Sequence, residues 1–412
     1  MSDFLQLITE IIIILIAAKI AGYLSTRLRQ PSVFGELLAG VLLGPSLLDI
    51  THLGFITNTH LDAMIYEMGE IGVLLLMFLA GLELHIKDLT KNTRAALLSG
   101  VLGVIIPVGS GLLFGELLGL PFDQALFLGL TLGATSVSIS AQVLIELKAL
   151  HSKVGLGLLG AAVFDDILVI LILSTAVAFL SGGGSVVDIL FVFVQMIVFL
   201  VVAAAFGIWV LPRLARLTGR LNISQGLTTL TVVTLLGYGL AAELIGGMAA
   251  ITGTFMAGLM FSRTPEKSAV ESSLHSLSYA FFVPIFFVSI GLQINLRELQ
   301  LDATWIFLAI SVIAILGKII GSGSGALLAK YKPHEALQMG IGMVSRGEVG
   351  LIIANIGAEE GYLSNEMLTI VVGVILVTTL VTPPLLRWSF KRPDKPTENP
   401  LPDKELQTRE NL

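Results

Sequence analysis

Long apolar stretches, separated by short polar or basic breaks, run through almost the whole chain. Most are about 20 residues long, the length at which an α-helix crosses the hydrocarbon core of a bilayer. Backbone groups in hydrocarbon must be hydrogen-bonded within their own segment, so stretches this apolar predict helices. The pattern predicts thirteen spans, near residues 5–26, 32–48, 63–86, 95–119, 122–146, 154–180, 187–212, 223–244, 247–262, 274–292, 303–329, 334–358 and 362–388.

The basic residues divide the connections between these predicted helices into two alternating sets. Of the 24 Lys and Arg residues, all but Arg297, Lys19, Lys318 and Arg346 fall in every second connection or in the C-terminal tail. Arg297 lies in the other set, and the remaining three lie within predicted helices. Because Lys and Arg accumulate in cytoplasmic loops, this alternation predicts an external N-terminus, a cytoplasmic C-terminus and an odd number of spans in the cell (plasma) membrane.

The composition agrees with an all-α polytopic membrane protein. Hydrophobic residues make up 55% of the chain and charged residues 13%, against about 25% charged in soluble domains. A net charge of −6 without a long basic run gives no basis for nucleic-acid binding, and the absence of cysteine excludes thiolate chemistry. No large soluble or nucleotide-binding domain fits, and we assign no cofactor. Residues 391–412, rich in proline and charge, predict a disordered cytoplasmic tail.

The chain contains a weak internal repeat. Residues 81–89 (GLELHIKDL) resemble residues 291–299 (GLQINLREL), at an offset of 210 residues. The two copies end the third and tenth predicted helices, which end on opposite sides of the membrane. Residues 39–40 and 257–258 (both Ala-Gly) pair the second and ninth helices in the same way. Unless these short matches recur by chance, they predict two inverted six-helix repeats joined by the seventh helix, an arrangement typical of alternating-access transporters.

Five ionisable residues lie deep within predicted helices: Asp165, Asp166, Lys318, Arg346 and Glu348. A charge at the bilayer centre costs about 2.5 to 3.5 kcal/mol on insertion scales, so each needs a partner or a task. Asp165, Lys318 and Arg346 are each twelve residues from a basic connection, which places all three about 18 Å deep. At matching depth, Asp165 or Asp166 can pair with Lys318.

The three carboxylates and two cationic groups leave one net negative charge, which either one monovalent cation or one proton would cancel. That equivalence is the physical basis for competition between a proton and a metal ion, and hard cations such as sodium prefer oxygen ligands. Adjacent Asp residues point about 100° apart on a helix, so one faces the ion and the other can hold Lys318. The alternative is a buried Asp–Lys pair that only locks two helices together, for which three carboxylates would be costly.

Two predicted helices are interrupted at this same depth. Residues 133–138 (GATSVS) break the fifth helix and residues 345–350 (SRGEVG) break the twelfth, at corresponding positions of the two proposed repeats. Such pairs predict discontinuous, crossed helices at a transport site. Arg346 and Glu348 are placed to compensate the opposite dipoles of the half-helix ends. For the fifth helix, close packing through small residues is the alternative.

Taken together, Phe164-Asp165-Asp166, Lys318, Thr135-Ser136 and the stretch 345–350 resemble the bacterial sodium/proton antiporters of the NapA-like branch of the cation:proton antiporter superfamily. The resemblance extends over about residues 5–388. It implies a thirteen-helix inverted-repeat fold, a homodimer, and an elevator-like movement of a core domain against a dimer domain. By the same resemblance, Asp166 is the main ion and proton carboxylate, Asp165 is the partner of Lys318, and Thr135 and Ser136 lie beside the ion.

The resemblance also implies a division of the chain into domains. The dimer or scaffold domain would comprise residues 1–90 and 221–300. The core ion-transport domain would comprise residues 91–182 and 301–390, with residues 183–220 as linker helix and 391–412 as tail.

The function predicted in this way is export of sodium and lithium in exchange for protons, by a transporter and not an enzyme. If Asp165 and Lys318 also exchange a proton, transport is electrogenic. A potassium/proton antiporter of the same fold is the main alternative, although such relatives commonly have Gln-Asp at the Asp165-Asp166 position and a nucleotide-binding domain. An intramembrane aspartyl protease would need two Asp residues on facing helices, and a channel would need a continuous polar pore.

Overall fold

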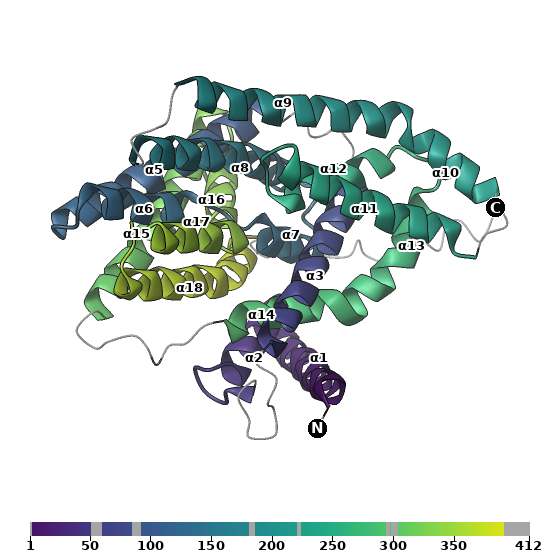
Figure 1. Cartoon of the computed structure of the whole chain (residues 1–412), viewed down its shortest axis with the longest axis horizontal. Coiled ribbons are helices and arrows are strands. Elements are labelled where there is room, and N and C mark those ends of the chain that lie inside the picture. The colour runs from purple at the N-terminus through teal and green to yellow at the C-terminus, as the bar shows by residue number, and fades with distance from the viewer. Residues whose placement is uncertain are drawn as a thin grey trace, which may run out of the picture.

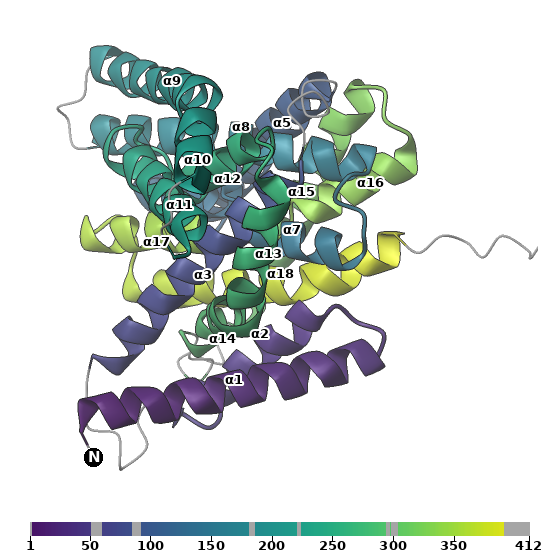
Figure 2. The same ribbon diagram turned by 90° about the vertical axis from the view of Figure 1, so that its right-hand side faces the viewer.

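The protein is a bundle of helices, seen from two directions in Figures 1 and 2. The computed structural model describes residues 2–50, 60–84, 92–180, 186–220, 224–293, 297 and 304–390, and within these ranges it contains helices and no strand. The helices are α1 (Asp3–Arg27), α2 (Ser32–Leu43), α3 (Leu61–Glu83), α5 (Thr93–Leu117), α6 (Phe122–Gly133), α7 (Val137–Glu146), α8 (Lys153–Leu180), α9 (Val186–Trp209), α10 (Leu211–Arg220), α11 (Gly226–Leu244), α12 (Ala250–Phe261), α13 (Lys267–Leu277), η2 (Ser278–Phe282, π-helical), α14 (Val283–Leu292), α15 (Thr304–Leu328), α16 (Pro333–Gly342), α17 (Glu348–Glu359) and α18 (Asn365–Phe390).

Ten helical segments within the described ranges are long and apolar enough to cross a membrane, and α2, α12 and α17 contain shorter apolar stretches. The outer helices have the surface of a membrane protein. On α1, Gln6 and Glu10 are fully buried, whereas Ile12, Ile16 and Ile20 are more than half exposed. In water such a face would be strongly unfavourable, so it is suited to lipid hydrocarbon. In both views α1 and α9 lie at opposite extremes of the molecule (Figures 1 and 2).

The helices fall into two groups by their packing. The core group consists of α5–α8 and α15–α18, which contact mainly one another. The scaffold group consists of α1–α3 and α11–α14 with η2, and α9 and α10 follow the core helix α8 in the chain and pack against both groups. Within the core group, α5 and α15 approach closely because Gly321 and Gly325 of α15 face backbone carbonyls of α5, where a side chain would not fit.

Two further helix crossings, both in the scaffold group, depend on glycine. Gly40 of α2 lies against α14 at Gly291, and Gly258 of α12 lies against α3, which carries Gly81. A Cβ atom added at any of the four would collide with main-chain atoms of the facing helix. Each crossing therefore requires glycine on both sides, and each joins one helix of the first half of the chain to one of the second half.

The core group contains the two interrupted helices. Residues 134–136 separate α6 from α7, and residues 343–347 separate α16 from α17, so the predicted breaks in the fifth and twelfth helices are confirmed. The two breaks cross and hydrogen-bond reciprocally. The Ser136 main-chain N–H donates to the Ser345 carbonyl at 2.9 Å, and the Ser345 hydroxyl donates to the Ser136 carbonyl at 2.7 Å.

Some predicted helix ends are wrong, because hydropathy alone does not fix a helix end. The second helix ends at Leu43 rather than residue 48, since Pro45 cannot continue it. The tenth begins at Lys267 rather than residue 274, with a polar first turn that the apolar pattern cannot reveal. The predictions for the tail 391–412, and for most of the repeat between 85–89 and 294–299, fall outside the described residues.

Candidate ion-binding site

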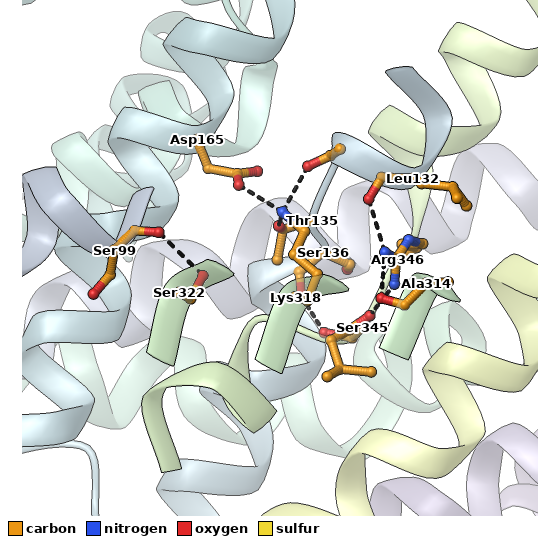
Figure 3. Close-up of polar contacts among 12 residues, drawn as sticks. Ser99, Leu132, Thr135, Ser136, Asp165, Ala314, Lys318, Ser322, Ser345 and Arg346 are labelled. Atoms are coloured by element: carbon orange, nitrogen blue, oxygen red, sulfur yellow. Dashed lines mark hydrogen bonds and ion pairs between the residues drawn. The ribbon is translucent and has the colours of Figure 1, made fainter. Parts of the chain in front are cut away.

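The ammonium group of Lys318 lies at the crossing of the interrupted helices. Lys318 of α15 is fully buried, and its Nζ donates to Asp165 Oδ1 at 2.7 Å, to the Gly133 carbonyl at 2.6 Å and to the Thr135 hydroxyl. Gly133 is the last residue of α6, so its carbonyl has no partner further along the helix. One cation thus satisfies both a buried carboxylate and the negative end of a half-helix (Figure 3).

Arg346 performs the same service for both interrupted helices. Its guanidinium is fully buried, with Nη1 donating to the Val344 carbonyl at 2.6 Å and Nη2 donating to the carbonyls of Leu132 at 2.7 Å and Ala314 at 2.9 Å. Leu132 lies in the last turn of α6, and Val344 follows the end of α16. Arg346 is therefore at the carbonyl ends of both half-helices (Figure 3). Glu348 is the first residue of α17, and its side chain lies outside the described part of the structure.

Asp166 occupies a different environment from its neighbour. Its Oδ2 accepts a hydrogen bond of 2.6 Å from the hydroxyl of Thr252, which belongs to α12 of the scaffold group. Both side chains are buried. Beside the carboxylate is a cavity of about 10 Å³, enough for roughly one water-sized particle. It is lined by Met77, Val137, Leu159, Ala162, Val163, Asp166, Ile251, Thr252 and Phe255. The carboxylate therefore lies on the boundary between the two groups of helices.

The structure divides the predicted site residues between two places. It brings Asp165, Lys318 and Thr135 together inside the core group, and it places Asp166 against the scaffold group. Ser136 is fully buried, and its hydroxyl lies 2.9 Å from that of Ser138. The described residues contain no cluster of three or more His, Asp or Glu side chains of the kind that holds a resident metal ion.

Sequence reasoning missed Thr252, because it searched predicted helices for ionisable residues and for breaks. The available signal was the pair Thr252 and Thr254 within an otherwise apolar short helix. A hydroxyl in hydrocarbon bonds either to its own helix or to another group. Thr254 donates to the Ile251 carbonyl of its own helix, whereas Thr252 reaches across to Asp166. The sequence does not distinguish the two.

A larger cavity of about 200 Å³ approaches the site from one end of the bundle. Its wall includes Tyr66 and Glu70 from the first part of α3, Glu243 from the end of α11, and Gly347 from the break before α17. Ile251 lines both this cavity and the small one at Asp166. The ion site is therefore close to a vestibule that carries two carboxylates.

At the other end of α3 the two groups are in direct contact. The carboxylate of Glu146, the last residue of α7, accepts from the Ser32 main-chain N–H at 2.7 Å and from the Ser32 hydroxyl at 2.6 Å. Ser32 is the first residue of α2, so a carboxylate of the core group lies on a helix N-terminus of the scaffold group. The ring of His151 also lies 3.0 Å from the carbonyl of Glu83. These contacts close this end of the boundary.

An all-helical bundle with crossed half-helices and buried ionisable residues between two groups of helices defines the class of ion-coupled membrane transporters. The sequence model of the family described as "Sodium/hydrogen exchanger, transmembrane" matches residues 12–392. The chain therefore belongs to the sodium/hydrogen exchanger family. The family is one of transporters, so the prediction of an antiporter rather than an enzyme is confirmed, and the protease alternative is excluded.

Individual relatives agree with this assignment. The chain is 39% identical over 386 residues to the Na⁺/H⁺-K⁺ antiporter GerN of Bacillus cereus, covering 94% of this chain and 97% of GerN. It is 36% identical over 396 residues to a Na⁺/H⁺ antiporter of Enterococcus hirae, covering 94% and 99%. Its fold is similar to that of the sodium proton antiporter MjNhaP1 of Methanocaldococcus jannaschii, with a TM-score of 0.69, 19% identity, and coverage of 94% and 97%.

Proposed function

We propose that this protein exchanges sodium, and also lithium, for protons across the cell membrane, with Asp166 as the carboxylate that binds either. The observation that supports this assignment is the position of Asp166. It is a buried acid beside a small cavity, on the boundary between two groups of helices, in a chain of the sodium/hydrogen exchanger family. A carboxylate there binds one proton or one hard cation, but the two compete for the same charge.

The neighbouring residues have supporting roles in this proposal. Asp165 is the fixed partner of Lys318, since the two form an ion pair of 2.7 Å with both side chains buried. Lys318 and Arg346 stabilise the carbonyl ends of the half-helices, so the crossing keeps its shape while the ion changes. Thr135 belongs to the Lys318 network, and Ser136 lies at the crossing itself. Exchange of a second proton at the Asp165–Lys318 pair would make transport electrogenic.

The arrangement of the chain supports two inverted repeats and thirteen spans. The crossing of α2 on α14 and that of α12 on α3 have the same glycine chemistry, and they exchange the roles of the two halves of the chain. The reciprocal hydrogen bonds between Ser136 and Ser345 relate the two breaks in the same manner. Thirteen spans result if the apolar helices α2 and α12 and the interrupted α16–α17 cross the membrane together with the ten longer segments. The alternation of basic residues then places the N-terminus outside and the C-terminus in the cytoplasm.

The cycle that we propose moves the core group against the scaffold group, as in an elevator. With the orientation above, the closed contact at Glu146 and Ser32 is cytoplasmic and the vestibule at Glu70 and Glu243 is external. The structure would thus correspond to the outward-facing state. A proton entering from outside displaces sodium from Asp166, the core moves inward, and the proton leaves to the cytoplasm. The resemblance to dimeric antiporters further suggests that the scaffold groups of two chains associate.

Potassium remains the alternative cation, because the printed name of the Bacillus cereus relative includes both sodium and potassium. The test is proton movement in reconstituted vesicles that hold a preformed pH gradient, with sodium, lithium or potassium added in turn. We expect sodium and lithium to dissipate the gradient and potassium to have little effect. A response to potassium alone would assign the chain to potassium/proton exchange.

Two variants locate the site in the same assay. Asp166→Asn removes the exchangeable charge, so we expect the cation response to be lost. Glu335→Gln removes a carboxylate at the exposed start of α16 and serves as a matched control that retains exchange. Retention of sodium-driven proton movement in Asp166→Asn would overturn the assignment of the site.

A further inference from the structure

We infer that Thr252 is a positioning residue that anchors the core group to the scaffold group while the Asp166 carboxylate is ionised and empty, and releases it when that carboxylate is loaded. The inference rests on the proposed function, because it assigns a role to the one carboxylate that carries the ion. It goes further in naming the group that makes movement depend on occupancy.

The location of the bond carries the first step. The Thr252 hydroxyl donates to Asp166 Oδ2 at 2.6 Å, and the two residues belong to α12 of the scaffold group and α8 of the core group. The other scaffold residues lining the small cavity at Asp166 are Met77, Ile251 and Phe255, all of them apolar. At this cavity, Thr252 is thus the scaffold residue that offers a polar side chain to the carboxylate. If the core moves relative to the scaffold, this bond must break.

The strength of the bond depends on the charge of the acid. A hydroxyl that donates to an ionised carboxylate makes a charge-assisted bond, roughly twice as strong as one between neutral groups. A proton on Asp166, or a cation in the cavity, neutralises or redirects that charge and weakens the bond. The empty, charged carrier is therefore held more firmly than either loaded form. That ordering is what coupled exchange requires, since an empty carrier that moved would allow each ion to cross alone.

The surroundings leave no other charge to perform this task from the scaffold side of the cavity. The charged groups that face Asp166 and its neighbour belong to the core group: Asp165 on the same helix, Lys318 on α15, and Arg346 at the break before α17. They move together with Asp166, so their attraction does not oppose movement. Thr252 does not titrate, and its bond follows the state of Asp166 alone.

The chain provides a matched control on the same helix. Thr254 is fully buried two residues further along α12, but its hydroxyl donates to the Ile251 carbonyl at 3.0 Å. Thr254→Val removes a hydroxyl of the same type without touching Asp166. Thr252→Val removes the anchor with almost no change of shape, and Thr252→Ser restores a hydroxyl.

The experiment compares these three variants with the unaltered protein in reconstituted vesicles, by two measurements. The first is the decay of a proton gradient with no sodium or lithium present. We expect Thr252→Val to lose the gradient several-fold faster than the unaltered protein, and Thr252→Ser and Thr254→Val to hold it. The second is the pH of half-maximal sodium exchange. In Thr252→Val the ionised acid loses a donor and accepts a proton more easily, so this pH should rise by up to about one unit, a tenfold change in proton concentration.

The outcomes separate this inference from the proposed function. If Asp166→Asn abolishes exchange but Thr252→Val matches the unaltered protein in both measurements, the anchor is wrong and the site assignment stands. Equal changes in Thr252→Val and Thr254→Val would also overturn the anchor, since they would reflect packing of α12. If Asp166→Asn retains exchange, the proposed function itself fails.

Discussion

Asp165 and Asp166 are consecutive residues of α8, yet they belong to different parts of the molecule. Asp165 is enclosed in the core group and forms an ion pair with Lys318 at 2.7 Å. Asp166 lies on the surface of that group, where it accepts a hydrogen bond from Thr252 of the scaffold. Successive helical residues point about 100° apart, so one dipeptide can face both ways. The comparison suggests how one helix provides both a fixed charge that holds the core together and an exchangeable charge at the moving boundary.

The largest effect on stability is expected on the Asp165 side. Lys318→Ala leaves Asp165 and the Gly133 carbonyl buried without their cation, and removing one member of a buried pair costs about 3 to 5 kcal/mol. Thermal unfolding of the protein in detergent measures this loss. The double variant Asp165→Asn with Lys318→Ala should recover part of it, because no charge is then left unbalanced. Additive losses in the double variant would contradict the pairing.

Arg346 is expected to have the next largest effect. Arg346→Ala leaves the carbonyls of Leu132, Val344 and Ala314 buried without a donor, so we expect a loss of about 3 kcal/mol in unfolding free energy. Arg346→Lys keeps the charge but not the fork of donors, and should recover only part. The measurement is again the thermal midpoint in detergent. An unchanged midpoint in Arg346→Ala would show that the half-helix ends do not depend on this side chain.

A smaller loss is expected in the scaffold, away from both aspartates. Gly258→Val would force α12 away from α3, and overpacking of this kind typically costs about 1 to 3 kcal/mol. Gly237 on α11 faces open space, so Gly237→Val is the matched control. Both are compared by thermal unfolding and by sodium exchange. Equal behaviour of the two variants would show that the α12–α3 crossing tolerates a side chain.

The smallest effect is expected at an exposed ion pair of the core group. Glu335 accepts from the Lys332 main-chain N–H at 2.8 Å and from Lys153 Nζ at 3.0 Å. Partial burial raises the pKa of Glu335, but these hydrogen bonds outweigh it and hold the pKa below its usual value. A lowered folded-state pKa means that the stabilisation is present above the unfolded pKa, near 4.3, and is lost as the pH falls through the folded value.

Glu335→Gln should therefore cost less than about 1 kcal/mol at pH 7 and nothing at a pH well below 4. Thermal midpoints of the variant and the unaltered protein, recorded at both pH values, check the sign. A gap between the two proteins that widened on acidification would contradict it. The contrast with Lys318 would then measure how much burial adds to an ion pair.

Much of the fold could be predicted from the sequence because a bilayer imposes simple rules. Apolar length predicts helices, and the breaks at 133–138 and 345–350 were visible because glycine and polar residues interrupt otherwise apolar helices. Helix ends were less predictable. The amphipathic first turns of α13 and the whole of α10 lie outside the apolar pattern, although the chain continues as helix.

The ionisable part of the site could likewise be predicted, because charge in hydrocarbon is costly enough to stand out. The depth of Asp165 and Lys318 could be counted along their helices, and the structure places them together. Thr252 could not be predicted, since a buried threonine satisfies its hydroxyl as readily on its own helix, as Thr254 does. Which side chain faces Asp166 depends on the rotation of α12 against α8, and a single sequence does not encode that angle in any visible pattern.

The most direct test of the account is proton release from the purified protein when sodium is added in a weakly buffered solution. If Asp166 binds either a proton or a cation, sodium should release protons in a saturable manner, and Asp166→Asn should release none. Thr254→Val should behave as the unaltered protein. Undiminished proton release from Asp166→Asn would contradict the account, because the competing site would then lie elsewhere.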